Sequence, residues 1–214
     1  MFDVCIMNYL AHLVLSGNDS DVLLGNFIGD AIKGRNYVGY PPRVAHGIRL
    51  HRQIDSFADH HPIALKARAQ LRPMLGRFSA VGVDLLYDYF LSSNFQSITG
   101  QGSIELFARR AEASLQPRMA EMPTRSQRFF EAMVEHDWLV GYGSEMGMIE
   151  FVELWTRLTK RFGVETPLKH LFEAARLAGY ADMKADFASF WKDVESHCHD
   201  QRLSPDTLEF VVQN

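Results

Sequence analysis

The chain has 214 residues, of which 47% are hydrophobic and 22% are charged, and its formal net charge is −4. This composition is near the average of folded soluble proteins, and the length suits one large domain or two small ones. Two cysteines near opposite ends exclude a disulfide framework, and no apolar run is long enough to cross a membrane. We therefore expect a cytoplasmic protein that does not insert into membranes.

Helical periodicity dominates the chain, because apolar residues recur at spacings of three or four. The predicted helices span residues 20–33, 42–58, 62–76, 80–92, 103–116, 125–139, 146–162, 167–179 and 181–197. Residues 93–102 are rich in glycine and polar side chains and predict a loop, whereas 209–214 fit either a strand or a frayed tail. Without internal repeats or a linker, the pattern predicts one all-α domain, a multi-helix bundle.

The charge is unevenly distributed along the chain. Residues 1–32 contain four acidic groups and no lysine or arginine, whereas residues 33–77 contain nine basic groups and two acidic ones. A basic segment on an acidic protein indicates a negatively charged partner or substrate. The alternative is a solvated helix face without a partner.

The stretch "GIRLHRQIDSFADHHP" at 47–62 carries the densest set of reactive side chains. His51 and Asp55 are four residues apart, so they share one helix face beside an apolar stripe that includes Ile54. A histidine and a carboxylate at this spacing can bind one metal ion or share one proton. The alternative is an ordinary polar pair on a helix surface.

The other polar residues of this stretch have weaker indications. Asp59 follows Asp55 by one turn and is either a further ligand or a cap for the helix that Pro62 opens. His60 and His61 are expected in a loop without a ligand role. The motif "HCHD" at 197–200 is interpreted as a polar tail.

Four further positions place costly polar groups in apolar helices. Asp30 needs a metal ion or an ion pair, for example with Lys33 or a nearby arginine. His12 is either a metal ligand or a core histidine whose ring nitrogens are hydrogen-bonded within the protein. Asp84 and Asp88 lie one turn apart in "VDLLYDYFL". Imidazoles and carboxylates together favour a divalent cation, whereas a structural zinc site would need thiolates. No phosphate-binding loop or serine nucleophile motif is present, and nothing beyond the basic segment indicates nucleic acid.

The motifs "MNYLAHLVLS", "LLGNFIGDAIKG", "GIRLHRQIDSFADHHP" and "DLLYDYFLS" resemble, in order and spacing, the acyl carrier protein phosphodiesterase family. They cover residues 7–95. The resemblance implies an all-helical fold, divergent from the HD-domain phosphohydrolases, and a divalent metal, typically manganese. It also implies a domain at 7–203, with 1–6 as an N-terminal extension and 204–214 as a C-terminal tail.

The resemblance also implies a set of site residues. The motif positions supply a metal-ligand set of His12, Asp30, His51, Asp55, Asp59 and Asp88. We predict catalytic roles for His51, Asp55 and Arg52, and contacts with the substrate phosphate for Lys33, Arg49 and Arg52. The family's usual histidine between Asp88 and Phe90 is Tyr89 in this chain.

By this resemblance the substrate is the holo form of acyl carrier protein, a strongly acidic partner. The reaction would hydrolyse the phosphodiester between 4′-phosphopantetheine and a serine, and the products would be apo-carrier protein and 4′-phosphopantetheine. Two alternatives remain open: a metal-dependent phosphohydrolase acting on a nucleotide or another small phosphoester, and a helical carrier-protein-binding module without catalysis. The sequence leaves the oligomeric state open.

Overall fold

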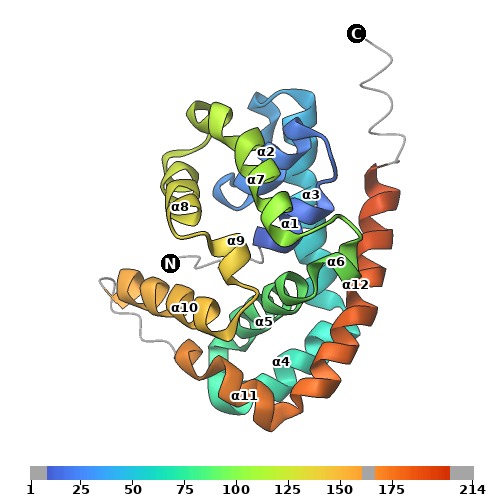
Figure 1. Cartoon of the computed structure of the whole chain (residues 1–214). Coiled ribbons are helices and arrows are strands. Elements are labelled where there is room, and N and C mark those ends of the chain that lie inside the picture. Colours follow the sequence, from blue (N-terminus) through green and yellow to red (C-terminus); the bar gives the residue numbers. More distant parts are fainter. Residues whose placement is uncertain (1–8, 161–166, 203–214) are drawn as a thin grey trace.

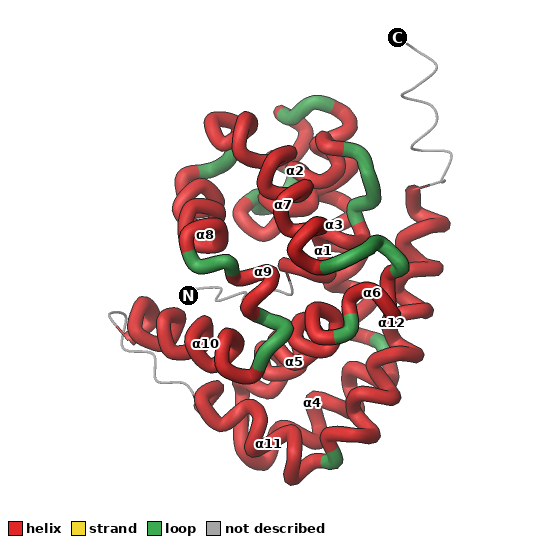
Figure 2. The backbone as a smooth tube through the Cα atoms, viewed as in Figure 1, coloured by secondary structure: helices red, strands yellow, loops and turns green. Residues whose placement is uncertain are grey.

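The computed structural model describes residues 9–160 and 167–202, and every regular element in these ranges is a helix (Figure 2). The α-helices are α1 (Tyr9–Leu15), α2 (Ser20–Ile28), α3 (Pro42–His60), α4 (Pro62–Leu75), α5 (Ser79–Ser93), α6 (Phe95–Thr99), α7 (Ile104–Leu115), α8 (Thr124–Glu135), α9 (Trp138–Gly141), α10 (Glu145–Lys160), α11 (Leu171–Ala178) and α12 (Tyr180–Arg202). Short 3-10 helices include η1 (Gly29–Ala31) and η2 (Asn36–Gly39). The predicted all-α class is confirmed, whereas the relation to HD-domain phosphohydrolases stays a prediction.

Local sequence signals explain most helix boundaries. The Asp19 side chain caps α2 by accepting from the backbone N–H groups of Asp21 and Val22, and Pro42 opens α3. The predicted helix at 20–33 ends earlier, at Ile28, where η1 takes over. The predicted loop at 93–102 contains the short helix α6.

Two interpretations of histidine-rich motifs need correction. His60 is the last residue of α3 and not a loop residue, whereas His61 lies between α3 and α4 as expected. His61 caps the helix that Pro62 opens, because its Nδ1 accepts from the N–H of Ile63. The motif at 197–200 is part of α12, and Cys198 is fully buried. The apolar face of α12 thus continues through this polar motif, and burial of that face keeps the motif helical. The predicted extension at 1–6 and the tail at 204–214 lie outside the described residues.

The hydrophobic core is shared by helices from both halves of the chain. Phe27, Phe90, Phe130 and Phe187 are among its largest fully buried side chains and come from α2, α5, α8 and α12. In Figure 1, α12 runs along one side of the molecule, and α5 lies between α1 and the α4–α11 end. Within the described ranges, no helix combines the length and apolarity needed to span a membrane.

Helices α2 and α3 pack in unusually close contact through two glycines. A Cβ atom on Gly25 would overlap the carbonyl oxygen of Val44, and one on Gly47 would overlap that of Val22. Backbone atoms cannot move aside as a flexible side chain can. This contact holds the middle of α3, including His51, against the end of α2.

Gly47→Ala is therefore expected to lower the free energy of unfolding by about 3 kcal/mol, because overpacking between backbones forces the two helices apart. Urea unfolding would measure the change. Gly39→Ala is the control, since a Cβ there meets no atom within 4 Å. Equal stability of the two variants would contradict the close packing.

Candidate metal centre

Three of the predicted site residues converge on one point. Nε2 of His12 lies 3.2 Å from Oδ1 of Asp55, and Nε2 of His51 lies 3.5 Å from Oδ2 of the same carboxylate. One potential ligand atom from each residue lies within 4.8 Å of the other two. The histidine rings stack at a centroid distance of 4.2 Å. The centre thus joins α1 to two successive turns of α3.

Asn26 fixes the orientation of the His12 ring. The Asn26 Nδ2 group donates to the carbonyl of His12 and to Oγ of Ser16, so its Oδ1 is left to accept from Nδ1 of His12 at 2.8 Å. Nδ1 therefore carries the ring proton, and Nε2 presents a lone pair. A hydrogen bond on the remote nitrogen is a common feature of metal-binding histidines.

The same residue orients His51, through its backbone. Nδ1 of His51 lies 2.8 Å from the carbonyl oxygen of Asn26, which can only accept, so His51 also keeps its proton on Nδ1. Gly29 makes this position possible, because a Cβ there would lie 2.5 Å from Cγ of His51. Both rings consequently point Nε2 toward Asp55.

The charge state of the centre favours a cation. Burial and the neighbouring His12 lower the pKa of His51 to about 3, so its ring is neutral at physiological pH. Burial alone would raise the pKa of Asp55, but a proton on His12 or His51 outweighs burial and lowers the pKa below its usual range, so positive charge between these groups keeps the carboxylate ionised. The Nε2 atoms of both histidines are buried and form no hydrogen bond. Three acceptor atoms this close repel one another unless a cation or proton lies between them, and their chemistry fits a divalent metal.

Asp88 has a different position from that predicted by its motif. Its carboxylate is 1% exposed and accepts from the backbone N–H groups of Leu10 and Ala11, at 3.3 and 3.2 Å. Burial raises its pKa well above the usual range despite these two bonds. Asp88 therefore holds the start of α1, the helix that carries His12.

Asp30 and Asp59 do not belong to the converging group either. The Asp30 carboxylate lies 3.6 Å from Arg125 on α8, which agrees with the alternative of an ion pair with a nearby arginine. Asp59 is 58% exposed and accepts from Arg68 at 2.6 Å. It is not the cap of α4, since His61 has that role.

The cations predicted to hold the phosphate have defined positions. Arg52 donates through Nη1 and Nη2 to the carbonyls of Gly34 and Ile32, both at 2.7 Å. Arg49 and Arg52 lie 5.8 and 5.3 Å from the ring centroid of Tyr37, and Lys33 is exposed in the same segment. Arg52 thus anchors the loop between η1 and α3, and its predicted catalytic role stays a prediction.

Tyr89 lies on a different side of α5 from Asp88. Its ring packs edge-on against Phe172, and its hydroxyl oxygen accepts from the hydroxyl of Tyr180 at 3.2 Å. These contacts turn the side chain toward α11 and α12. Tyr89, which replaces the family's usual histidine, therefore packs against α11 and α12. It is not one of the three converging residues.

Asp84 lies one turn before Asp88 on α5. Burial raises its pKa to about 7, with Arg68 opposing the shift and the carboxylates of Asp55 and Asp59 reinforcing it. The folded protein then binds more protons than the unfolded chain between about pH 4 and 7, so this residue's contribution to stability is lost as the pH rises through that window.

Asp84→Asn is expected to stabilise the metal-free protein at pH 8, because the buried carboxylate is then charged and the amide is not. The upper limit is about 4 kcal/mol, the energy that corresponds to raising the carboxyl pKa from 3.8 to about 7. At pH 4 the substitution should have little effect, because the native carboxyl is then protonated. Thermal unfolding in EDTA at the two pH values measures the difference. A gain independent of pH would contradict the raised pKa.

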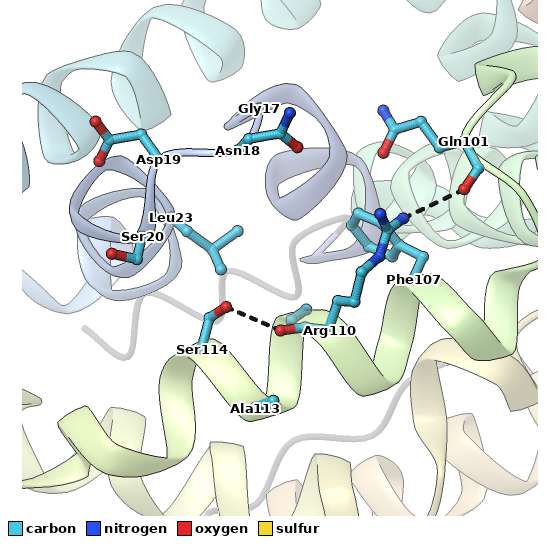
Figure 3. Close-up of a pocket in the computed structure, with 11 residues that line it drawn as sticks. Gly17, Asn18, Asp19, Ser20, Leu23, Gln101, Phe107, Arg110, Ala113 and Ser114 are labelled. Atoms are coloured by element: carbon cyan, nitrogen blue, oxygen red, sulfur yellow. Dashed lines mark hydrogen bonds between the residues drawn. The ribbon is translucent and has the colours of Figure 1, made fainter.

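A cavity of about 350 Å³ lies elsewhere, at the start of α2 beside α7. Figure 3 shows Arg110 at this pocket, with Nη2 donating to the carbonyl of Gln101 at 3.2 Å. None of the three converging residues lines it. The candidate metal centre therefore lies outside this cavity.

Sequence reasoning missed Asn26, although "GNFIGD" contains it. The available signal was an amide inside an otherwise apolar helix, where a polar group is expensive to bury without partners. Asn26 is 0% exposed, and its polar groups bond His12, Ser16 and His51.

Comparison with known proteins agrees with the motif pattern. The family model described as acyl carrier protein phosphodiesterase matches residues 7–194. An acyl carrier protein phosphodiesterase of Photorhabdus laumondii is 31% identical over 136 residues, covering 64% of this chain and 69% of that protein. Proteins of the same name from Yersinia pestis and Klebsiella pneumoniae are 30% and 31% identical, covering 64% and 68% of this chain and 70% and 75% of their own lengths. No solved structure matches the chain. The chain belongs to the acyl carrier protein phosphodiesterase family.

Proposed function

We propose that the protein hydrolyses the phosphodiester that joins 4′-phosphopantetheine to a serine of acyl carrier protein. Family membership supports the substrate, and the convergence of His12, His51 and Asp55 on one point carries the chemistry. The basic segment at 33–77 suits an acidic protein substrate. The distant cysteines suit a reducing cytoplasm, where we place this activity.

The three converging residues are our proposed metal ligands, and Mn²⁺ is the proposed ion. Two imidazoles and one carboxylate leave coordination positions open for substrate and water. A divalent cation held there would neutralise phosphodiester oxygens and lower the pKa of bound water.

The positions of the ligands suggest how the substrate approaches. The side chains of His12 and His51 are 1% and 3% exposed, whereas that of Asp55 is 37% exposed. The phosphodiester therefore approaches from the side of Asp55, which can accept a proton from the attacking water. The new bond joins water oxygen to phosphorus, and the bond from phosphorus to the serine oxygen breaks. The phosphate leaves with pantetheine, and the serine oxygen takes up a proton.

The test is to incubate the protein with holo-acyl carrier protein and Mn²⁺ and to weigh the carrier protein by mass spectrometry. We expect loss of the phosphopantetheine mass, and no loss in EDTA. An intact carrier protein under conditions where a known family member is active would refute the proposal. Turnover of nucleotides or other small phosphoesters alone would instead identify a different phosphohydrolase.

A further inference from the structure

The segment between η1 and the middle of α3 concentrates positive charge. Residues 31–54 contain five basic side chains and no acidic one: Lys33, Arg35, Arg43, Arg49 and Arg52. Several basic residues elsewhere in the described part of the chain are paired with carboxylates. The described pairs include Lys66–Asp186, Arg68–Asp59, Arg118–Glu121, Arg125–Asp30 and Arg176–Glu145.

Two arginines of this segment are ordered without being neutralised. Arg52 donates to backbone carbonyls, and Arg49 and Arg52 lie over the Tyr37 ring, so their partners carry no net charge. Arg43 differs, because its guanidinium bonds the Asp19 carboxylate. The ordering of Arg49 and Arg52 lowers the entropy that a partner would otherwise have to remove on binding.

An apolar side chain lies within this charged surface. Val38 on η2 is 66% exposed, which is among the highest values for a large hydrophobic residue in the described ranges. Arg35, three residues earlier, is exposed and forms no ion pair with any described residue. We call Arg35, Tyr37, Val38, Arg49 and Arg52 the cationic platform.

The cationic platform adjoins the proposed metal centre. Arg52 follows the ligand His51 directly in α3, and Gly29 of η1, where the segment begins, packs on the His51 ring. A protein bound to the platform would therefore lie next to Asp55, the most exposed ligand. A surface remote from the centre could not deliver a tethered phosphodiester so directly.

We infer that the cationic platform is the docking surface for the acidic carrier protein, with arginines facing its carboxylates and Val38 contacting an apolar side chain among them. This inference rests on the proposed function and deepens it. Charge complementarity of this kind speeds encounter and sets orientation more than it adds affinity. Its loss should therefore raise KM for the protein substrate and leave the chemistry of a small phosphodiester intact.

The test compares Arg35→Glu with Arg72→Glu, a matched control. Arg72 is exposed on α4, at the opposite end of the molecule from α2 (Figure 1), and forms no ion pair with a described residue. We expect Arg35→Glu to lower kcat/KM for holo-carrier protein by about tenfold through KM, and to weaken its salt dependence. Hydrolysis of bis(p-nitrophenyl) phosphate with Mn²⁺ should be unchanged in both variants. Val38→Asn should also raise KM for the carrier protein, without any change in charge.

The outcomes separate the two proposals. Equal carrier-protein kinetics for Arg35→Glu and Arg72→Glu, in a wild-type chain that is active, would overturn the docking surface alone. A fall in small-diester hydrolysis matching the fall for the carrier protein would also overturn it, because the effect would then lie in the metal centre. A wild-type chain that leaves holo-carrier protein intact would overturn both proposals.

Discussion

His51→Ala is expected to reduce hydrolysis of holo-carrier protein by about 10³-fold or more, since metal stabilisation of transition-state charge contributes several kcal/mol and each 1.36 kcal/mol is a factor of ten. Binding of Mn²⁺, measured by calorimetry, should fall in parallel. The fold should persist, because the substitution removes one of three mutually repelling acceptors. Asp55→Asn should have the same direction of effect, since it removes the only formal negative charge among the three groups.

His60→Ala is the control for this experiment. His60 lies on the same helix, is exposed, and forms a hydrogen bond through Nδ1 with the backbone carbonyl of Ser56. Its substitution should leave metal binding and turnover unchanged. If His51→Ala retained both the metal stoichiometry and the rate of the wild type, the proposed centre would be wrong.

Asn26→Ala should weaken metal binding by about 10- to 100-fold, the range typical for residues that orient metal-binding histidines. The substitution removes the acceptor of the His12 Nδ1 proton and the donor to Ser16 and the His12 carbonyl. Because it also leaves buried polar groups without partners, we expect a loss of about 3 kcal/mol in the free energy of unfolding.

Nitrogen NMR of the histidine rings separates the orienting role from the loss of stability. In the metal-free wild type, His12 and His51 should both carry the proton on Nδ1, whereas in Asn26→Ala His12 alone should lose this preference. His51 keeps its bond because the Asn26 backbone carbonyl remains. Ser16→Ala, which removes only the hydroxyl from this network, should lower stability slightly and leave the tautomers unchanged. An unaltered His12 tautomer in Asn26→Ala would contradict the orienting role.

Helix positions were predictable because their signals lie within a few residues of each boundary. Pro42 and Pro62 open α3 and α4 as expected, and apolar spacing located most of the other helices. The errors arose where a tertiary contact outweighed local composition. The polar motif at 197–200 continues α12 because Cys198 is buried against the core, a contact made by residues far apart in sequence.

The pairing of His51 with Asp55 could also be predicted, because helical geometry alone places residues four apart on one face. His12 was a candidate metal ligand, but nothing in the sequence could show that α1 brings the His12 ring against the His51 ring. The sequence left Asp30 and Asp88 as ligand candidates from their motifs, and Asp59 as a further candidate or a helix cap. Their actual contacts, with Arg125, with the start of α1 and with Arg68 respectively, depend on how helices pack.

By itself, then, the sequence determined the helical class, the family motifs, the basic segment and the His51–Asp55 pair, all of which follow from residue type and short spacing. Only the tertiary structure decided which histidine completes the group and which carboxylates have other partners. It also revealed that Asn26 sets the proton positions on both rings. The physical reason is that helix formation depends on local backbone geometry, whereas convergence depends on the close contact of α2 with α3 and on the buried carboxylate that anchors α1.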